Sequence, residues 1–472
     1  MVVKEKKFLD DSVISFDRKH RATLHHNISK YDEAVVRGKS RYTRFAEARK
    51  YASDVKEAAL SGLADNLLLF EKKATENGTR VLWASDGRDA LMHIRKIFEE
   101  NGVKQVVKSK SMITEEIHLN EYCDTLGIEA VETDLGEFIV QTAGEKPYHI
   151  LTPAMHKSKE DVARLFHEKF GTNPQATPAD ITAFVRDRLR KIFAGADAGI
   201  TGANFLVADV GGVALTENEG NGLMTLSFPK VHIAIAGIER VIPSVRQLPF
   251  FWQWLGVHGT GQAISAYNSL VCGPKSPQES DGPEKMYVIL LDNGRSKLLK
   301  YGEEWQALKC IRCGACLNAC PVYKSVGGYT YGSVYTGPIG SVLTPFYSGF
   351  KEFGHLSDAC TVCGRCSEVC PVKIPLHELL LLNRKRKVEE TGEKTLWKLG
   401  MATFGYVFSS RRRLDLVNGR WKRRLAKLNR HILGEHKEFP RFADQSFSQR
   451  WISEHGKVPG HLSATNPASK YQ

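Results

Sequence analysis

Apolar residues recur every three or four positions along the first part of the chain, the spacing that places them on one face of a helix. The clearest stretch is "YTRFAEARKYASDVKEAALSGLADNLLLFEKKA" (42–74). This pattern predicts an N-terminal helical arm over residues 1–74, packed on the part of the chain that follows it.

From Arg80 the pattern changes to short apolar runs that alternate with amphipathic stretches. The expected strands are "RVLWA" (80–84), "KQVVK" (104–108) and "IEAVET" (128–133). The expected helices between them cover 87–102 and 114–127. Alternation of this kind predicts a parallel sheet with right-handed crossovers. The predicted helix starts, each a hydroxyl residue with an acidic residue in the next turn, are Thr114, Ser158 and Thr177.

Glycine then punctuates a β-rich region. The stretch "NFLVADVGGVALTENEGNG" (204–222) has the pattern of a hairpin that turns at Gly211 and Gly212. Further strands are expected within 231–242 and 285–294. We therefore place one α/β domain over residues 75–295.

The chain has 472 residues, more than a single hydrophobic core usually serves, so two or more domains are expected. Its 42% hydrophobic and 25% charged residues are typical of globular proteins, and no apolar run is long enough to span a bilayer. The first residues lack the apolar core of a signal peptide. We therefore expect a cytoplasmic protein, in which thiols stay reduced and closely spaced cysteines hold metal.

Positive charge gathers near the C-terminus. The net charge of the whole chain is +13, and residues 383–430 alone hold fifteen Lys and Arg against four Asp and Glu. We expect residues 391–472 to form a basic tail, which is either a solvated helical segment or a docking surface for an acidic partner or an anionic membrane. No nucleic-acid-binding motif accompanies the charge, so nucleic acid is not expected as a partner.

Eight of the ten cysteines lie in two runs with the same spacing, "CIRCGACLNACP" (310–321) and "CTVCGRCSEVCP" (360–371). The form C-x2-C-x2-C-x3-C-P is the spacing of bacterial ferredoxins, in which three cysteines bind one 4Fe–4S cluster and the fourth completes the cluster of the other run. This rule predicts two clusters, one held by Cys310, Cys313, Cys316 and Cys370, and one by Cys360, Cys363, Cys366 and Cys320. The alternative is a pair of structural zinc sites, which would not need the third close cysteine or the Cys-Pro pair.

The interval between the two runs, which holds "GGYTYGSVYTGPIG" (327–340), is long for a minimal ferredoxin. It resembles the α-helical ferredoxin domains of succinate dehydrogenase-type iron–sulfur subunits. This resemblance implies an α-helical ferredoxin domain over residues 296–390.

Longer stretches along most of the chain resemble the lactate-utilisation protein B family. They are "VKSKSMITEEIHLN" (107–120), "VETDLGEFIVQ" (131–141), "GITGANFLVADVGGVALTENEGNG" (199–222), "GPIGSVLTPF" (337–346) and "CPVKIPLHELLL" (370–381). The resemblance implies a LUD domain, with a sheet similar to those of CoA-transferases and sugar isomerases, joined to a twin-cluster ferredoxin domain. It also implies action with lactate-utilisation proteins A and C, a cysteine-rich redox subunit and a second LUD protein, in the NAD-independent oxidation of L-lactate to pyruvate. The chain would then be the iron–sulfur electron-transfer subunit.

The residues agree with an electron carrier that does not bind a hydride acceptor. "HGTGQAIS" (258–265) follows no clear strand and lacks the third glycine of a dinucleotide loop. A small-molecule site is expected beyond the carboxyl ends of the strands, where lysine charge and a helix dipole would favour a lactate or pyruvate carboxylate. The candidate binding residues are Lys108, Lys110, Ser111, Glu116, Asp134, Glu137 and His232, with His118 and the loop 216–222 as further candidates.

Two other functions stay open from the sequence. A twin-cluster shuttle could serve another 2-hydroxy acid or a quinone-linked pathway, of the glycolate or glycerol-3-phosphate type. The other is a CoA- or sugar-phosphate-binding enzyme with structural clusters. A CoA-transferase needs a catalytic glutamate, and only fold analogy points to Glu217 or Glu219 for that role.

Overall fold

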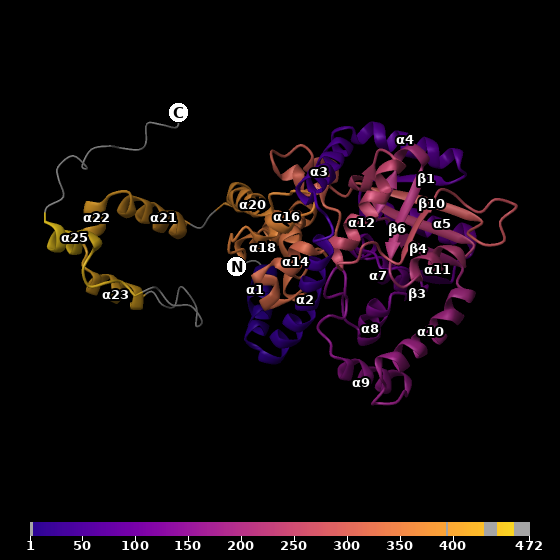
Figure 1. The fold of residues 1–472 in the computed structure, drawn as a ribbon, viewed down its shortest axis with the longest axis horizontal. Helices are drawn as coiled ribbons and strands as arrows, with labels where there is room; N and C mark the ends of the chain where they lie inside the picture. The colour runs from indigo at the N-terminus through magenta and orange to yellow at the C-terminus, as the bar shows by residue number, and fades with distance from the viewer. Residues whose placement is uncertain (1–2, 393–394, 429–440, 457–472) are drawn as a thin grey trace. The chain divides into compact units, whose positions relative to one another are not determined.

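The computed structural model describes residues 3–392, 395–428 and 441–456. The chain divides into two compact units, one that ends at Thr391 and one that begins at Gly392. In Figure 1 the first unit runs from indigo to orange and the second is yellow. The predicted division into 1–74, 75–295, 296–390 and 391–472 stays a prediction.

A six-stranded parallel sheet forms the centre of the first unit, in the order β1-β10-β7-β4-β2-β3. The strands are β1 (Arg80–Ala84), β2 (Gln105–Lys108), β3 (Glu129–Glu132), β4 (Ala198–Gly202), β7 (Val231–Gly237) and β10 (Lys285–Leu291). The predicted parallel sheet is confirmed. The apolar pattern did not predict β4, because its sequence "AGITG" holds two glycines and only one large apolar residue.

A second sheet has four strands in the order β8-β5-β6-β9. They are β5 (Phe205–Val207), β6 (Gly212–Glu217), β8 (Val241–Ile242) and β9 (Tyr267–Val271). The antiparallel pair β5 and β6 is the predicted hairpin. Its turn needs glycine at position 211, because Gly211 has a φ of 62° and an added Cβ would lie 2.2 Å from the backbone nitrogen of Ala74.

Helices cover both faces of the parallel sheet, because alternate residues of each strand point to opposite faces. On β7, Ile233 and Ile235 pack in a core with α5 (Gly87–Asn101), whereas Ala234 and Ala236 pack in a core with α4 (Leu63–Glu76). The other helices here are α6 (Met112–Glu116), α7 (Leu119–Thr125), α8 (Leu135–Ala143), α9 (Lys159–Phe170), α10 (Pro178–Gly195), α11 (Asn221–Ser227) and α12 (Leu248–Gly259). Among the described residues, no helix has the length and apolar character needed to cross a membrane.

Two of the three predicted helix starts are confirmed. Ser158 and Thr177 each form a capping box with an aspartate three residues later. The predicted start at Thr114 is wrong, because α6 begins directly after Ser111 and the Thr114 hydroxyl donates to the Ser111 carbonyl at 2.7 Å inside the first turn. The single helix predicted to follow is interrupted at His118, which has a left-handed φ of 58° between α6 and α7.

The N-terminal arm is helical, as predicted. Its helices are α1 (Val3–Asp11), α2 (Arg18–Lys39), α3 (Phe45–Ser61) and α4. Leu24 and Ile28 of α2 are buried in a core that also contains Trp254 of α12 and Tyr323 of the cysteine-rich part. Figure 1 shows indigo α1 and α2 beside the orange helices of that part. The arm therefore packs against both the α/β part and the cysteine-rich part.

Short helices surround the two cysteine runs. They are α13 (Arg295–Leu298), α14 (Ala315–Ala319), α15 (Pro321–Val326), α16 (Gly337–Ser348), α17 (Phe350–Phe353), α18 (His355–Asp358), α19 (Arg365–Val369) and α20 (Leu376–Thr391). The third cysteine of each run, Cys316 or Cys366, lies on α14 or α19, and these two helices pack against each other. Two runs that are far apart in sequence are thus brought side by side.

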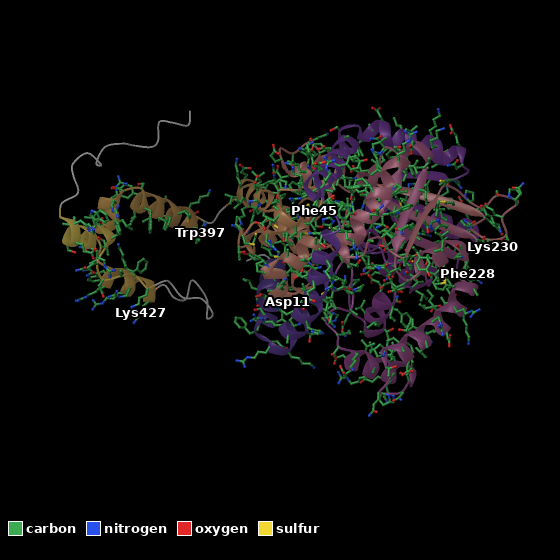
Figure 2. All side chains as sticks on the ribbon, viewed as in Figure 1. Asp11, Phe45, Phe228, Lys230, Trp397 and Lys427 are labelled. Atoms are coloured by element: carbon green, nitrogen blue, oxygen red, sulfur yellow. The ribbon has the colours of Figure 1, made fainter. Side chains whose placement is uncertain are left out.

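The second unit contains α21 (Thr395–Phe408), α22 (Arg411–Asp415), α23 (Gly419–Leu428) and α25 (Phe447–His455). Figure 2 labels Trp397 on α21 and Lys427 on α23. The α21 helix exposes apolar side chains, among them Trp397, Leu399 and Phe404. Four consecutive basic residues, 384–387, form a basic cluster on α20 of the first unit, where Arg386 pairs with Glu304. That cluster is therefore used in packing the first unit.

Candidate metal centres and the adjoining cavity

The two cysteine runs form loops of the same conformation. In each, the residue before the second cysteine is left-handed, Arg312 with a φ of 60° and Val362 with a φ of 55°, and Gly314 and Gly364 both have a φ of 76°. The backbone N–H of Arg312 donates to Sγ of Cys310 at 3.4 Å, and that of Val362 donates to the corresponding sulfur at 3.2 Å. The equal spacing of the cysteines therefore corresponds to equal local structure.

The Cys-Pro pair at the end of each run also directs a sulfur toward backbone donors. Sγ of Cys320 accepts from the N–H of Tyr323 at 3.5 Å, and Sγ of Cys370 accepts from the N–H of Ile374 at 3.3 Å. Proline supplies no N–H and fixes its own φ, so it suits the first position of α15 after Cys320. N–H···S bonds of this kind stabilise sulfur that carries negative charge.

The fourth cysteine of each run lies with the other run. Cys370 lines one small cavity together with Cys310, Cys313 and Cys316. Burial raises the pKa of the Cys316 thiol, and the nearby Cys310, Cys313 and Cys370 thiols raise it further.

Cys320 lies near thiols of the second run. Burial raises the pKa of the Cys320 thiol, and Cys360 and Cys363 add to that rise. Burial raises the pKa of Cys366 to about 12, with contributions from Cys320 and Cys360. Cys320 is therefore grouped with the second run.

These two groups of thiols fit iron–sulfur clusters. All eight cysteines are free, and burial raises the pKa of the Cys313, Cys316, Cys320, Cys366 and Cys370 thiols, which opposes their ionisation unless cations lie among them. Among the described residues, no three or more His, Cys, Asp or Glu side chains converge on one point suited to a single ion. Four thiolates around a cubane are spread more widely than the ligands of one ion.

Two separate parts of the first unit hold the second loop in place. Arg49 of α3 donates to the carbonyl oxygens of Cys370 at 2.7 Å and Ser367 at 2.6 Å. The indole of Trp254, on α12, donates to the carbonyl of Pro371 at 3.1 Å. The arm and the α/β part therefore fix the cysteine backbone from outside.

The first loop is held by the segment after α8. His149 is fully buried with its Nε2 3.1 Å from Oδ1 of Asn318 on α14, and burial lowers the pKa of His149 to about 3. The Tyr323 hydroxyl donates to the carbonyl of Tyr148 at 2.9 Å. Tyr148 also packs so closely on Gly328 that an added Cβ would lie 1.8 Å from its carbonyl oxygen. The neutral imidazole of His149 and two tyrosines thus join the segment after α8 to the cysteine-rich part.

A cavity of about 380 Å³ lies at the carboxyl ends of β2, β4 and β7. Its lining includes Lys110, Ser111 and Asp134 from the sheet side and Arg312 from the first cysteine loop. The position agrees with the general placement of ligand sites in open α/β sheets. The cavity therefore reaches from the sheet to the first candidate cluster.

Buried charged side chains form part of the wall of this cavity. Arg295 donates to Oε2 of Glu239 at 2.6 Å, and its two terminal nitrogens donate to both carboxylate oxygens of Glu116 at 2.8 and 2.9 Å. Tyr335 also donates to Glu116, and Nη2 of Arg312 lies 3.5 Å from Oε1 of Glu239. Burial would raise the pKa of both carboxyls, but the arginines outweigh it and lower the pKa of Glu239 to about 2.

Two family models match the chain, the "LUD domain" over residues 67–291 and the "4Fe-4S dicluster domain" over residues 306–374. The chain is 43% identical over 362 residues to "Lactate utilization protein B" of Bacillus licheniformis, and the alignment covers 76% of each chain. It is 42% identical over 367 residues to the protein of that name from Bacillus subtilis, covering 77% of this chain and 76% of the relative.

This chain belongs to the lactate utilization protein B family. It is also 40% identical over 380 residues to "Uncharacterized electron transport protein YkgF" of Escherichia coli, covering 77% of this chain and 80% of the relative. A solved structure, a DUF162 family protein from Deinococcus radiodurans, aligns with a TM-score of 0.28 and 15% identity, over 48% of this chain and 98% of that one.

In this lactate utilization protein B family member, the predicted small-molecule residues do not all meet in one place. Lys110, Ser111 and Asp134 line the 380 Å³ cavity, together with Glu217 and Glu219 of the predicted loop.

A second cavity of about 540 Å³ also takes in Lys110 and Ser111. Its lining includes Glu116, His118 and Glu137. Burial and the neighbouring Glu132 raise the pKa of Glu137. The predicted residues therefore divide between two cavities that meet at the start of α6.

Lys108 and His232 line neither cavity. Nζ of Lys108 is buried and lies 2.7 Å from Oε1 of Glu132. His232 is buried inside β7, where its Nε2 lies 2.9 Å from the hydroxyl oxygen of Thr201, and burial lowers the pKa of His232 to about 4. Both side chains support the sheet around the cavities.

The 380 Å³ cavity of this chain also has lining residues that the sequence pattern did not indicate, namely Arg240, Glu239, Arg295 and Arg312. Arg312 did carry one signal. The two runs share their cysteines, one glycine and the final proline, and the position before the second cysteine is Arg312 in one and Val362 in the other. Each run holds one arginine, Arg312 or Arg365, at a different position of the loop, and of the two only Arg312 lines the 380 Å³ cavity.

Proposed function

We propose that this chain is the iron–sulfur electron-transfer subunit of a multi-protein complex that oxidises L-lactate to pyruvate independently of NAD and so allows growth on lactate. Its family relatives are named for lactate utilization, and the dicluster model covers both cysteine runs. We further propose lactate-utilisation proteins A and C as its partners. The reduced cysteine runs suit the cytoplasm.

The observation that carries the proposal is that Cys370, the last cysteine of the second run, lines one small cavity with three cysteines of the first run. We assign Cys310, Cys313, Cys316 and Cys370 to one 4Fe–4S cluster and Cys360, Cys363, Cys366 and Cys320 to the other. The shared cavity of the first four thiols supports this assignment. The proximity of Cys320 to Cys360 and Cys363 supports it as well.

When bound, each such cluster accepts and releases one electron, so two clusters match the two electrons of 2-hydroxy acid oxidation. The residues of the chain set the conditions for this chemistry. The N–H groups of Arg312, Tyr323, Val362 and Ile374 donate to sulfur and stabilise its negative charge. Ile150, Ile339 and Val372 line the first cysteine cavity and keep water from the sulfurs.

We propose that Lys110, Ser111 and Asp134 contribute to a small-molecule site in the α/β part, with Glu116 and Glu137 beside it. Lys108 and His232 are proposed as positioning residues there, because each contacts residues of the surrounding elements and neither lines a cavity. The basic tail is proposed as a docking surface for an acidic face, whether of a partner protein or of a membrane.

The test is to purify the chain anaerobically with its co-expressed partners, add L-lactate and follow cluster reduction by electron paramagnetic resonance. The proposal expects reduced-cluster signals with L-lactate and none when the partners are omitted. Reduction by glycolate or glycerol 3-phosphate, but not by L-lactate, would favour a shuttle for another substrate. CoA-transfer activity that survives removal of the clusters would contradict the electron-transfer role.

A further inference from the structure

The side chain of Arg312 is buried without being satisfied. It is only 7% exposed, and its Nε and Nη1 have no hydrogen-bond partner among the residues that the structure describes. Its remaining nitrogen lies 3.5 Å from Glu239, at the limit of a hydrogen bond. The guanidinium lines the 380 Å³ cavity and stacks on Tyr335, 4.4 Å from the ring centroid. A buried cation with two enclosed, unused donors therefore stands at the wall of a cavity.

The neighbouring carboxylates do not balance this charge. Glu116 and Glu239 both make their short contacts with Arg295, at 2.6 to 2.9 Å. Arg240 also lines the cavity and lies 4.0 Å from Glu239. Three arginines thus share two carboxylates, and a buried guanidinium whose donors are not all used is costly unless a further acceptor joins it.

The rest of the cavity indicates what kind of anion fits. Its lining includes the carboxyl groups of Asp134, Glu217 and Glu219, so a large polyanion would be repelled. Guanidinium groups match the two oxygens of a carboxylate. A small molecule with a carboxylate at one end and a hydroxyl next to it could pair with the arginines and donate to a carboxyl group.

We infer that this cavity binds a small 2-hydroxy acid, with its carboxylate held by Arg312 and Arg240. That the ligand is a small monocarboxylate follows from the arginines together with the acidic residues of the lining, whereas its identity as a 2-hydroxy acid rests on the proposed function. The site differs from the candidates drawn from the sequence, because its anion-binding residues follow β7 and lie within the first cysteine run.

Arg312 also links the cavity to the first cluster. Its side chain lines the cavity, while its backbone N–H donates to Sγ of Cys310 at 3.4 Å. A ligand that fixes the side chain should alter the donor to that sulfur. We therefore expect ligand binding to change the electron paramagnetic resonance spectrum of the cluster at Cys310 and to leave that of the other cluster unchanged.

The two cysteine runs provide a matched pair of variants. Arg312→Val introduces the residue that stands at the same position of the second run, where Val362 has the same left-handed backbone. Arg365→Ala introduces the residue type of the corresponding position in the first run, which is Ala315. It removes an arginine that lines none of the described cavities. Each variant removes one positive charge from one cysteine loop.

The experiment measures binding of L-lactate and pyruvate to the anaerobic full-length chain by calorimetry, with inorganic phosphate as a comparison. Saturable binding of both acids is expected, weakened about tenfold to a hundredfold by Arg312→Val and unchanged by Arg365→Ala. Iron content is measured for each variant. If Arg312→Val loses iron, Arg240→Met takes its place, and weakened binding with full iron content supports the inference.

Any of three results would overturn the inference. The first is that protein with full iron content shows no saturable binding of either acid. The others are that Arg312→Val and Arg365→Ala bind the acids equally tightly, or that phosphate binds as tightly as L-lactate. Unchanged binding by Arg240→Met, where that variant is needed, would also overturn it. These failures differ from failure of the proposed function, in which the acids bind but L-lactate and the partners do not reduce the clusters.

Discussion

Replacing Glu239 by glutamine removes the negative charge at the centre of the arginine network and leaves the shape of the side chain almost unchanged. Glu239 is buried, with 1% of its surface exposed, and its carboxylate serves Arg295 at 2.6 Å, Arg312 at 3.5 Å and Arg240 at 4.0 Å. Glutamine can still accept one hydrogen bond from Arg295. Arg295 would keep its contacts with Glu116, whereas Arg312 and Arg240 would lose the charge of the carboxylate that they contact.

The magnitude can be worked from the pKa of Glu239. Burial would raise this pKa, but Arg295, Arg240 and Arg312 lower it from the usual 4.5 to about 2. A carboxyl with this difference stabilises the folded state by about 3 kcal/mol, a contribution that is present above pH 4.5 and is lost as the pH falls through about 2. Loss of one partner from a buried ion network costs about 3–5 kcal/mol, which agrees.

The assay is urea unfolding of the anaerobic protein followed by circular dichroism. Glu239→Gln is expected to lower the free energy of unfolding by about 3 kcal/mol between pH 5 and pH 7, with a smaller difference below pH 4.5. The control is Glu47→Gln, since Glu47 pairs with Arg44 on the surface, and it should change stability by less than about 1 kcal/mol. Equal effects of the two variants would refute the reasoning.

Two further substitutions test the packing around the sites. Arg49→Gln removes the 2.7 and 2.6 Å hydrogen bonds to the carbonyls of Cys370 and Ser367, each worth about 1.5 kcal/mol or more. A chelator should therefore remove iron from this variant at least about tenfold faster. An unchanged rate of bleaching of the visible absorbance would contradict this expectation. Lys108→Met should lower the free energy of unfolding by about 3–5 kcal/mol because Glu132 loses its buried partner, and adding Glu132→Leu should restore most of it in urea titrations. A double variant no more stable than Lys108→Met would contradict this explanation.

The cysteine spacing and the apolar pattern predicted the features that depend on local sequence. The strands β1, β2 and β3 and the capping boxes at Ser158 and Thr177 are each encoded within a few residues, and the structure contains them. The cluster residues were predicted from spacing as well, because the loop that binds a cubane is short. Their assignment stays a prediction.

The arginines of the cavity wall could not be predicted in this way, because their roles depend on contacts across the chain. Arg312 meets Glu239 over 73 positions of sequence, and Arg295 meets Glu116 over 179. Lys108 follows the pattern of an anion-binding residue at the end of β2, but Glu132 on the adjacent strand β3 binds its ammonium group. Sequence position alone does not tell a free cation from a paired one.

The exchange of the fourth cysteine between the two loops is tested most directly by comparing Cys320→Ser with Cys313→Ser and Cys363→Ser. Each variant is purified anaerobically, and the electron paramagnetic resonance of the reduced protein is recorded together with its iron content. Cys313 belongs to the first loop and Cys363 to the second, so their spectra define the loss of each cluster. The account predicts that the Cys320→Ser spectrum matches that of Cys363→Ser. A spectrum that matches Cys313→Ser would contradict it.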